Sequence, residues 1–239
     1  MIPYIIINGK SSKEVNGLII QSLPPISKPA IRTEIEEIDG RDGDIVTTLG
    51  YQAYDRSILI GLKGDFDIDE VIEFFNSSGQ VTFSNELDKY YNFAIYEQID
   101  FDKLIRFRTA TVTLHVQPFK YSIDEPPIVW TNTKELGAAA ISVRNTGNIY
   151  SKPTLTIVGS GAIKVNLDDT QILKITLSNT TETIIIDVAE MNATDTDGNL
   201  LNRRVVGDYN KLVFDKGINN LEVEGTLTSV TVDTYSRWI

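Results

Sequence analysis

The chain has 239 residues, 33 acidic and 22 basic side chains, a formal charge of −11 and no cysteine. Disulfides, zinc–thiolate sites and iron–sulfur sites are therefore excluded, and with no Lys/Arg run the chain is not expected to hold nucleic acid. Its apolar runs are far shorter than the roughly 18 residues of a membrane helix, and the amino-terminal run is too short for a signal peptide. We expect a soluble protein without membrane association.

The length favours two domains, because a typical domain holds about 100–200 residues. We place the boundary near residue 125, where Pro126 and Pro127 fix φ and bias Glu125 to an extended form that suits a linker. The predicted domains are residues 1–125 and residues 126–239. Most segments alternate apolar and polar residues, the period of two that indicates half-buried strands, so we expect a mainly β protein.

The first domain opens with predicted strands at residues 4–8 and 15–22, followed by an alternating strand at 31–38. A cluster of glycines and charges comes next, and the segment 51–62 is predicted to be the return strand of a hairpin. Glycine and aspartate tolerate positive φ, so the cluster is expected to form the hairpin turn. The cluster consists of Gly40, Arg41, Asp42, Gly43 and Asp44.

One helix is predicted, at about residues 68–78. Asp67 is placed to cap its start, Glu70 occupies the capping-box position, and Gly79 lies where a left-handed C-terminal cap would fall. Apolar residues at helical spacing form one stripe that is expected to pack on a sheet: Ile68, Val71, Ile72 and Phe75.

Strands are predicted again at residues 80–84, 90–99 and 105–119. Beyond the linker, short strands at regular spacing reach residue 235, divided by Asn, Asp and Gly turns. This pattern is typical of a β-sandwich or jelly roll. The segment 159–162 is predicted to be one of the turns, and no helix is predicted in the second domain.

Side chains that could carry chemistry are few, and no catalytic, cofactor-binding or metal-binding residue is predicted. The single histidine, His115, lies in a predicted strand on the face opposite Leu114 and Val116. A side chain at this position is expected to face solvent or an interface, and not to belong to a Ser-His-Asp triad.

The segment 193–204 has the outline of a calcium loop around Gly198. With Gly198 at the sixth position, Ala193 and Arg204 fall at the first and twelfth positions, where carboxylates are required. We therefore interpret the segment as a hairpin turn with Gly198 at positive φ.

Several stretches, in this order, resemble one family. They are "DGRDGD" at 39–44, "YDRSILI" at 54–60, "FFNSSGQVTFS" at 74–84, "RFRTATVTLHVQPFKY" at 106–121, "VRNTGNIYSKPTLTIVGSG" at 143–161, and the end of the chain from "KGINNLEVEG" at 216–225 to "RWI". Together they resemble the distal tail protein (Dit) family of phages with long non-contractile tails that infect Gram-positive bacteria.

The resemblance implies a structural protein of the virion tail tip, assembled in the host cytoplasm. It implies an N-terminal sandwich or barrel-like domain with one helix, which forms a hexameric ring, and a peripheral C-terminal galectin-like or carbohydrate-binding-module-like β-sandwich. The implied partners are the tail tube protein, the tail-associated lysin or tip protein and, in some phages, receptor-binding proteins. Acidic side chains are expected to line a channel for DNA, and no enzymatic activity or cofactor is implied.

In this family a hairpin between the second and third strands extends as an arm onto the neighbouring subunit, and residues 31–62 look like that hairpin. The alternative is a solvated turn within one subunit. The resemblance implies a subunit interface at Gly40, Arg41, Asp42, Gly43, Asp44, Tyr51 and Tyr54.

A second hypothesis is a carbohydrate-binding module for host cell-wall polysaccharide, carried by residues 126–239. Such a module needs aromatic platforms, and the only tryptophans are Trp130, in the predicted linker, and Trp238. A third hypothesis, an acidic-residue hydrolase, lacks any carboxylate pair that the sequence singles out.

Overall fold

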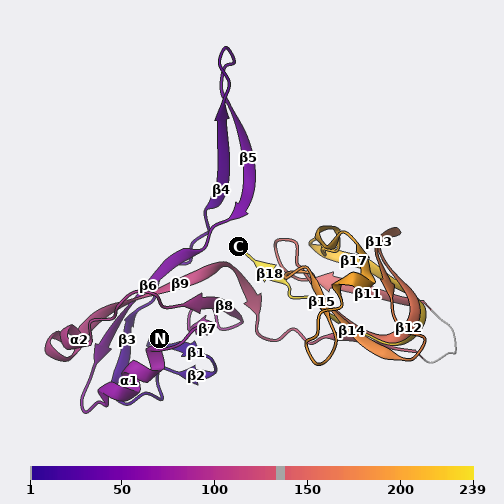
Figure 1. Ribbon diagram of the computed structural model, residues 1–239. Coiled ribbons are helices and arrows are strands. Elements are labelled where there is room, and N and C mark those ends of the chain that lie inside the picture. The colour runs from indigo at the N-terminus through magenta and orange to yellow at the C-terminus, as the bar shows by residue number, and fades with distance from the viewer. Residues whose placement is uncertain (1, 133–137) are drawn as a thin grey trace. The chain divides into compact units, whose positions relative to one another are not determined.

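The computed structural model describes residues 2–132 and 138–239, and the chain forms two compact units (Figure 1). Unit 1 runs from the amino terminus to Ile123, and unit 2 runs from Asp124 to Trp238. Residues 133–137, which fall in the predicted linker segment, lie outside the described residues. Both units are built mainly of strands, as predicted. In the described ranges no helix is long and apolar enough to cross a membrane.

Unit 1 is built on an antiparallel sheet with the strand order β2-β1-β7-β8-β9-β6-β3. Alternation explains its core: Ile58 and Ile60 of β6 and Val112 and Leu114 of β9 are fully buried. The strands are β1 (Ile5–Ile7), β2 (Lys10–Ser11), β3 (Leu18–Ser22), β6 (Tyr54–Leu62), β7 (Gly79–Phe83), β8 (Lys89–Ala94) and β9 (Thr109–Ser122).

The predicted helix is present as α1 (Ile68–Phe75), and Asp67 caps it by accepting hydrogen bonds from backbone N–H groups of the first turn. The expected capping box is incomplete. The Glu70 carboxylate accepts from the backbone N–H of Asn16 and from Nζ of Lys10, at 3.1 and 3.2 Å, and thus ties the helix to the chain around β2.

The end and the buried face of α1 also differ from the prediction. Phe75 is buried as expected, but Phe74 is buried beside it, whereas Ile72 is 36% exposed. Phe74 thus takes the buried place expected for Ile72, and its larger apolar side chain gains more from burial. The helix ends at Asn76, and Gly79 begins β7 instead of capping the helix.

A second helix, α2 (Phe101–Phe107), was not predicted, and its last three residues fall in the segment 105–119 that was predicted to be a strand. Asp100 caps it by accepting from the backbone N–H of Lys103 at 2.8 Å, and Arg108 ends it in the left-handed conformation with φ 57°. Leu104 is its buried residue, so seven residues give no apolar period that the sequence could reveal. Strand β9 therefore begins at Thr109.

The hairpin after residue 30 is shorter than predicted. Strand β4 (Ile31–Glu37) pairs with β5 (Asp44–Tyr51), and residues 54–62 form β6 in the main sheet. The predicted return strand was wrong because segment 54–62 carries the inward-facing isoleucines that the core of unit 1 needs. Among the described strands, β4 and β5 pair only with each other.

Unit 2 is a β-sandwich organised by two long neighbouring strands, β12 (Thr154–Leu167) and β17 (Gly217–Asp233). On its other edge each long strand pairs with two strands in succession. The first half of β12 pairs with β14 and the second half with β13, whereas the first half of β17 pairs with β11 and its later part with β10. Because each long strand belongs to two layers, the layers close around one core. The remaining strands of this sheet are β10 (Ile128–Thr131), β11 (Ala139–Asn145), β13 (Thr170–Thr176), β14 (Glu182–Asp187), β15 (Asn192–Thr194) and β16 (Val205–Gly207). The short strand β18 (Arg237–Trp238), near the end of the chain, is not part of it.

Three predictions for unit 2 were wrong. The segment 159–162 is a bend inside β12, where the register with β17 shifts, and not a turn between strands. Two short 3-10 helices, η1 (Asn202–Arg204) and η2 (Tyr209–Lys211), occur in unit 2, where no helix was predicted. Trp130 lies in β10 and packs against the core of unit 2 instead of lying in a linker.

Candidate interaction surface

The most exposed element of unit 1 is the hairpin of β4, β5 and the six residues between them, residues 31–51, which we call the arm (Figure 1). Every residue of β4 is exposed. The arm nevertheless carries large apolar side chains at exposures of 42–60%: Ile31, Ile35, Ile38, Val46 and Leu49.

The register of the arm divides its side chains into two faces, because directly opposed residues of an antiparallel pair share a face. One face, which we call the apolar face, has the pairs Ile31/Tyr51, Thr33/Thr48 and Ile35/Val46, and ends near the tip with Glu37/Asp44. The opposite face has the pairs Arg32/Gly50, Glu34/Thr47 and Glu36/Ile45. The arm is thus an amphipathic ribbon with carboxylates at the end of its apolar face.

The predicted interface residues of the glycine cluster lie together at the tip of the arm. Gly40 and Gly43 have φ of 81° and 76°, and the backbone N–H of Arg41 donates to the carbonyl of Ile38 at 3.1 Å. Both glycines adopt the left-handed conformation that the turn needs. All five residues of the cluster, including Asp42 and Asp44, are exposed.

The two predicted interface tyrosines lie at the base of the arm. Tyr51 is half-buried, and its ring meets the ring of Phe119 edge-on at 5.3 Å. The Tyr54 hydroxyl lies 3.5 Å from the carbonyl oxygen of Ser27, and burial raises the pKa of Tyr54. Tyr54 therefore supports the chain that leads into the arm, and the structure does not place it with the tip residues.

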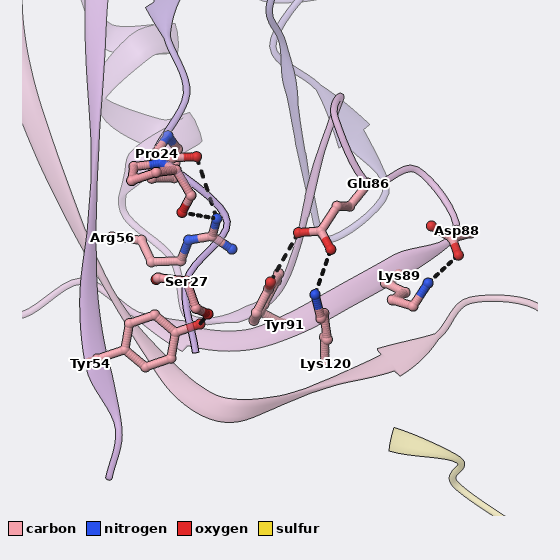
Figure 2. A network of polar contacts seen from close by, with 10 residues as sticks. Pro24, Ser27, Tyr54, Arg56, Glu86, Asp88, Lys89, Tyr91 and Lys120 are labelled. Carbon is pink, nitrogen blue, oxygen red and sulfur yellow. Dashed lines mark hydrogen bonds and ion pairs between the residues drawn. The ribbon is translucent and has the colours of Figure 1, made fainter. Parts of the chain in front are cut away.

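Arg56 of β6 anchors the chain that enters the arm, although the sequence analysis did not single it out. It is 2% exposed, its guanidinium lies over the rings of Phe83 and Tyr91, and it donates to the carbonyl of Pro25 at 3.0 Å (Figure 2). The signal was present in the sequence, because period-two alternation places Arg56 on the inward face with Ile58.

A buried ion pair lies beside this anchor. Lys120 of β9 and Glu86 are 2.6 Å apart, each side chain is 11% exposed, and the Tyr91 hydroxyl donates to Glu86 at 3.1 Å (Figure 2). Burial raises the pKa of Tyr91 far above its ordinary value, so the hydroxyl remains a donor. Buried polar and aromatic contacts near the base of the arm thus connect β6, β8 and β9.

Among the described residues, the polar groups outside the arm do not assemble into a recognisable reaction site. His115 of β9 is opposite in orientation to the buried Leu114 and Val116, as predicted, and its Nδ1 lies 2.7 Å from Asp55. Gly198 adopts φ 83° in the turn predicted for it, and the Asp195 carboxylate accepts from the backbone N–H of Asn199. Within the described residues no group of three or more His, Asp or Glu side chains could hold a metal ion.

Unit 2, which the carbohydrate-binding hypothesis concerns, has a hollow of about 370 Å³ on its surface. Its lining, as far as the structure describes the chain, contains no aromatic side chain on which a sugar ring could stack. The lining residues are Ala140, Ile141, Ser142, Asp169, Asn220, Leu221 and Glu222.

The architecture has a solved counterpart over nearly its full length. The Dit protein of phage SPP1, described as a paradigm of the hub adsorption apparatus in phages that infect Gram-positive bacteria, superposes with a TM-score of 0.67 over 97% of this chain and 98% of that one, at 18% identity. The chain has the Dit fold. The sequence resemblance is thereby confirmed at the level of the fold.

Two structures of the phage p2 baseplate in its activated conformation, with calcium and with strontium, match the Dit fold of this chain more distantly. Their TM-scores are 0.47 and 0.46 over 97% of this chain and 97% and 96% of those chains, at 10% and 11% identity. No protein-family model and no curated protein matches the sequence.

Proposed function

We propose that this protein is a distal tail protein, a structural hub at the tail tip of a long-tailed phage or prophage. Six copies form a ring in which unit 1 makes the ring contacts and unit 2 lies at the periphery. The ring joins the tail tube protein to the lysin or tip protein, carries receptor-binding proteins in some assemblies, and lets DNA pass. The full-length similarity to the SPP1 Dit protein supports this role.

The exposed arm is the observation that carries the proposal. Ile35 and Val46 form a directly opposed pair on the apolar face, and the part of the chain that the structure describes leaves them 60% and 58% exposed. A two-stranded ribbon gains little stability alone, and exposed apolar side chains with unpaired strand edges favour association. We therefore assign Gly40–Asp44 to a subunit interface at the tip of the arm, with Tyr51 and Tyr54 supporting its base.

A ring explains why such an arm does not drive unlimited aggregation. An arm that contacts a different surface of the next copy makes a head-to-tail interface, and a head-to-tail interface that closes on itself satisfies every arm. The charge of −11 suits a channel that repels passing DNA.

The test removes the arm while sparing the sheet. Residues 33–49 are replaced by a Gly-Gly turn, which leaves β6 and its anchor Arg56 intact. Native mass spectrometry should give six times the chain mass for the wild type and one chain mass for the deletion, with an unchanged thermal melting profile. A deletion variant that forms the same ring, or a wild type that remains monomeric at high concentration, would contradict the proposal.

A further inference from the structure

Helix α2 presents an exposed aromatic side chain between two cations. Phe107 is 70% exposed, and Lys103 lies one turn before it on the same side of the helix. Arg106, three residues after Lys103, borders the same surface and is exposed. We call Lys103, Arg106 and Phe107 the α2 surface.

Neither Lys103 nor Arg106 takes part in an ion pair among the residues that the structure describes. The same holds for Glu37 and Asp44 at the end of the apolar face of the arm. The α2 surface thus contributes two exposed cations and the arm contributes two exposed carboxylates, and each pair lies next to exposed apolar side chains.

We propose that the α2 surface of one copy receives the arm of a second copy, an inference that rests on the proposed function and adds the acceptor site. The arm offers the apolar pair Ile35/Val46 followed by the acidic pair Glu37/Asp44. The α2 surface offers Phe107 beside its two cations. In this contact Phe107 covers the apolar pair of the arm, and the two cations meet its two carboxylates.

Two other exposed apolar side chains of unit 1, one in α1 and one after β8, fit the arm less well because an acidic residue follows each of them. Ile72 of α1 is followed by Glu73, and Tyr96 is followed by Glu97. An acidic arm is repelled at such places, and like charges brought together at an interface suppress wrong contacts. Because the arm and the α2 surface are different patches, their contact is head-to-tail, the geometry that a ring requires.

Charge exchange tests the contact directly. The helix variant carries Lys103→Glu and Arg106→Glu, and the arm variant carries Glu37→Lys and Asp44→Lys. Each variant alone places like charges together in every contact, which should raise the concentration for half-assembly by about a hundredfold or more. In an equal mixture the two variants can alternate around the ring with opposite charges in every contact. Assembly should return, and native mass spectrometry should find equal numbers of the two chains.

The control is Lys63→Glu with Lys211→Glu, the same charge change at exposed lysines elsewhere, and it should assemble like the wild type. Circular dichroism melting confirms that every variant is folded. If the helix variant assembles like the wild type while the arm deletion does not, the arm contacts another surface and this inference is wrong, although the proposed function stands. A mixture that remains monomeric also overturns it. A wild type that never assembles overturns both.

Discussion

The apolar face of the arm allows a prediction that separates assembly from folding. Ile35→Ser together with Val46→Ser replaces the opposed apolar pair by small polar side chains. Both side chains are more than half exposed in the single chain, at 60% and 58%. The free energy of unfolding of the isolated chain should therefore change by less than about 1 kcal/mol.

The expected effect on assembly follows from the area that remains to be buried. Full burial of an Ile or Val side chain is worth about 1.5–3 kcal/mol, so covering the exposed share of each contributes about 1–2 kcal/mol. Two such side chains give about 2–4 kcal/mol per contact, which corresponds to a loss of about 30- to 1,000-fold in association constant.

Light scattering over a dilution series measures this loss, and thermal melting measures the stability of the single chain. The matched control is Val206→Ser with Ile218→Ser, which removes the same two residue types from positions of unit 2 that are 69% and 70% exposed. The control should assemble like the wild type. The reasoning is refuted if the arm substitutions leave the dilution midpoint unchanged, or if the control shifts it equally.

Three predictions concern the supports of the fold. Glu86→Ala leaves the buried Lys120 unpaired and should cost about 3–5 kcal/mol in denaturant unfolding, and adding Lys120→Met should recover most of the loss. A double variant as unstable as the single one would contradict this explanation. Arg56→Lys removes the guanidinium that holds Pro25, so the amide of Gln52, which donates to the carbonyl of Ala30 at the end of the same segment, should exchange about tenfold faster while amides of unit 2 are unchanged. Hydrogen bonds from Asn199 lower the pKa of Asp195 from its ordinary value of 3.8. The ionised Asp195 therefore stabilises the fold at pH values above the unfolded-state pKa, and this contribution is lost as the pH falls through the folded-state pKa. The difference in melting temperature between the wild type and Asp195→Ala should be largest near neutral pH and should shrink below about pH 4; a constant difference would refute this linkage.

Local patterns in the sequence were enough to predict much of this protein. Alternation identified the strands around Ile58 and Leu114, Asp67 marked the start of α1, and Gly40 and Gly43 marked the tip of the arm. Each of these features depends on residues within a few positions of one another, through side-chain period, capping or tolerance of positive φ. The order of the short motifs was also sufficient to predict the Dit fold.

Other features depend on residues far apart in the chain. The return strand of the arm is Asp44–Tyr51 because the core of unit 1 takes Tyr54–Leu62, and the segment 159–162 bends within a strand because β12 serves two layers of the sandwich. Helix α2 buries a single leucine, so its local pattern is too weak to compete with the alternation that follows. Several segments have a similar local preference for the strand conformation. Which of them pair and become buried depends on contacts between distant parts of the chain, and these contacts exist only in the folded structure.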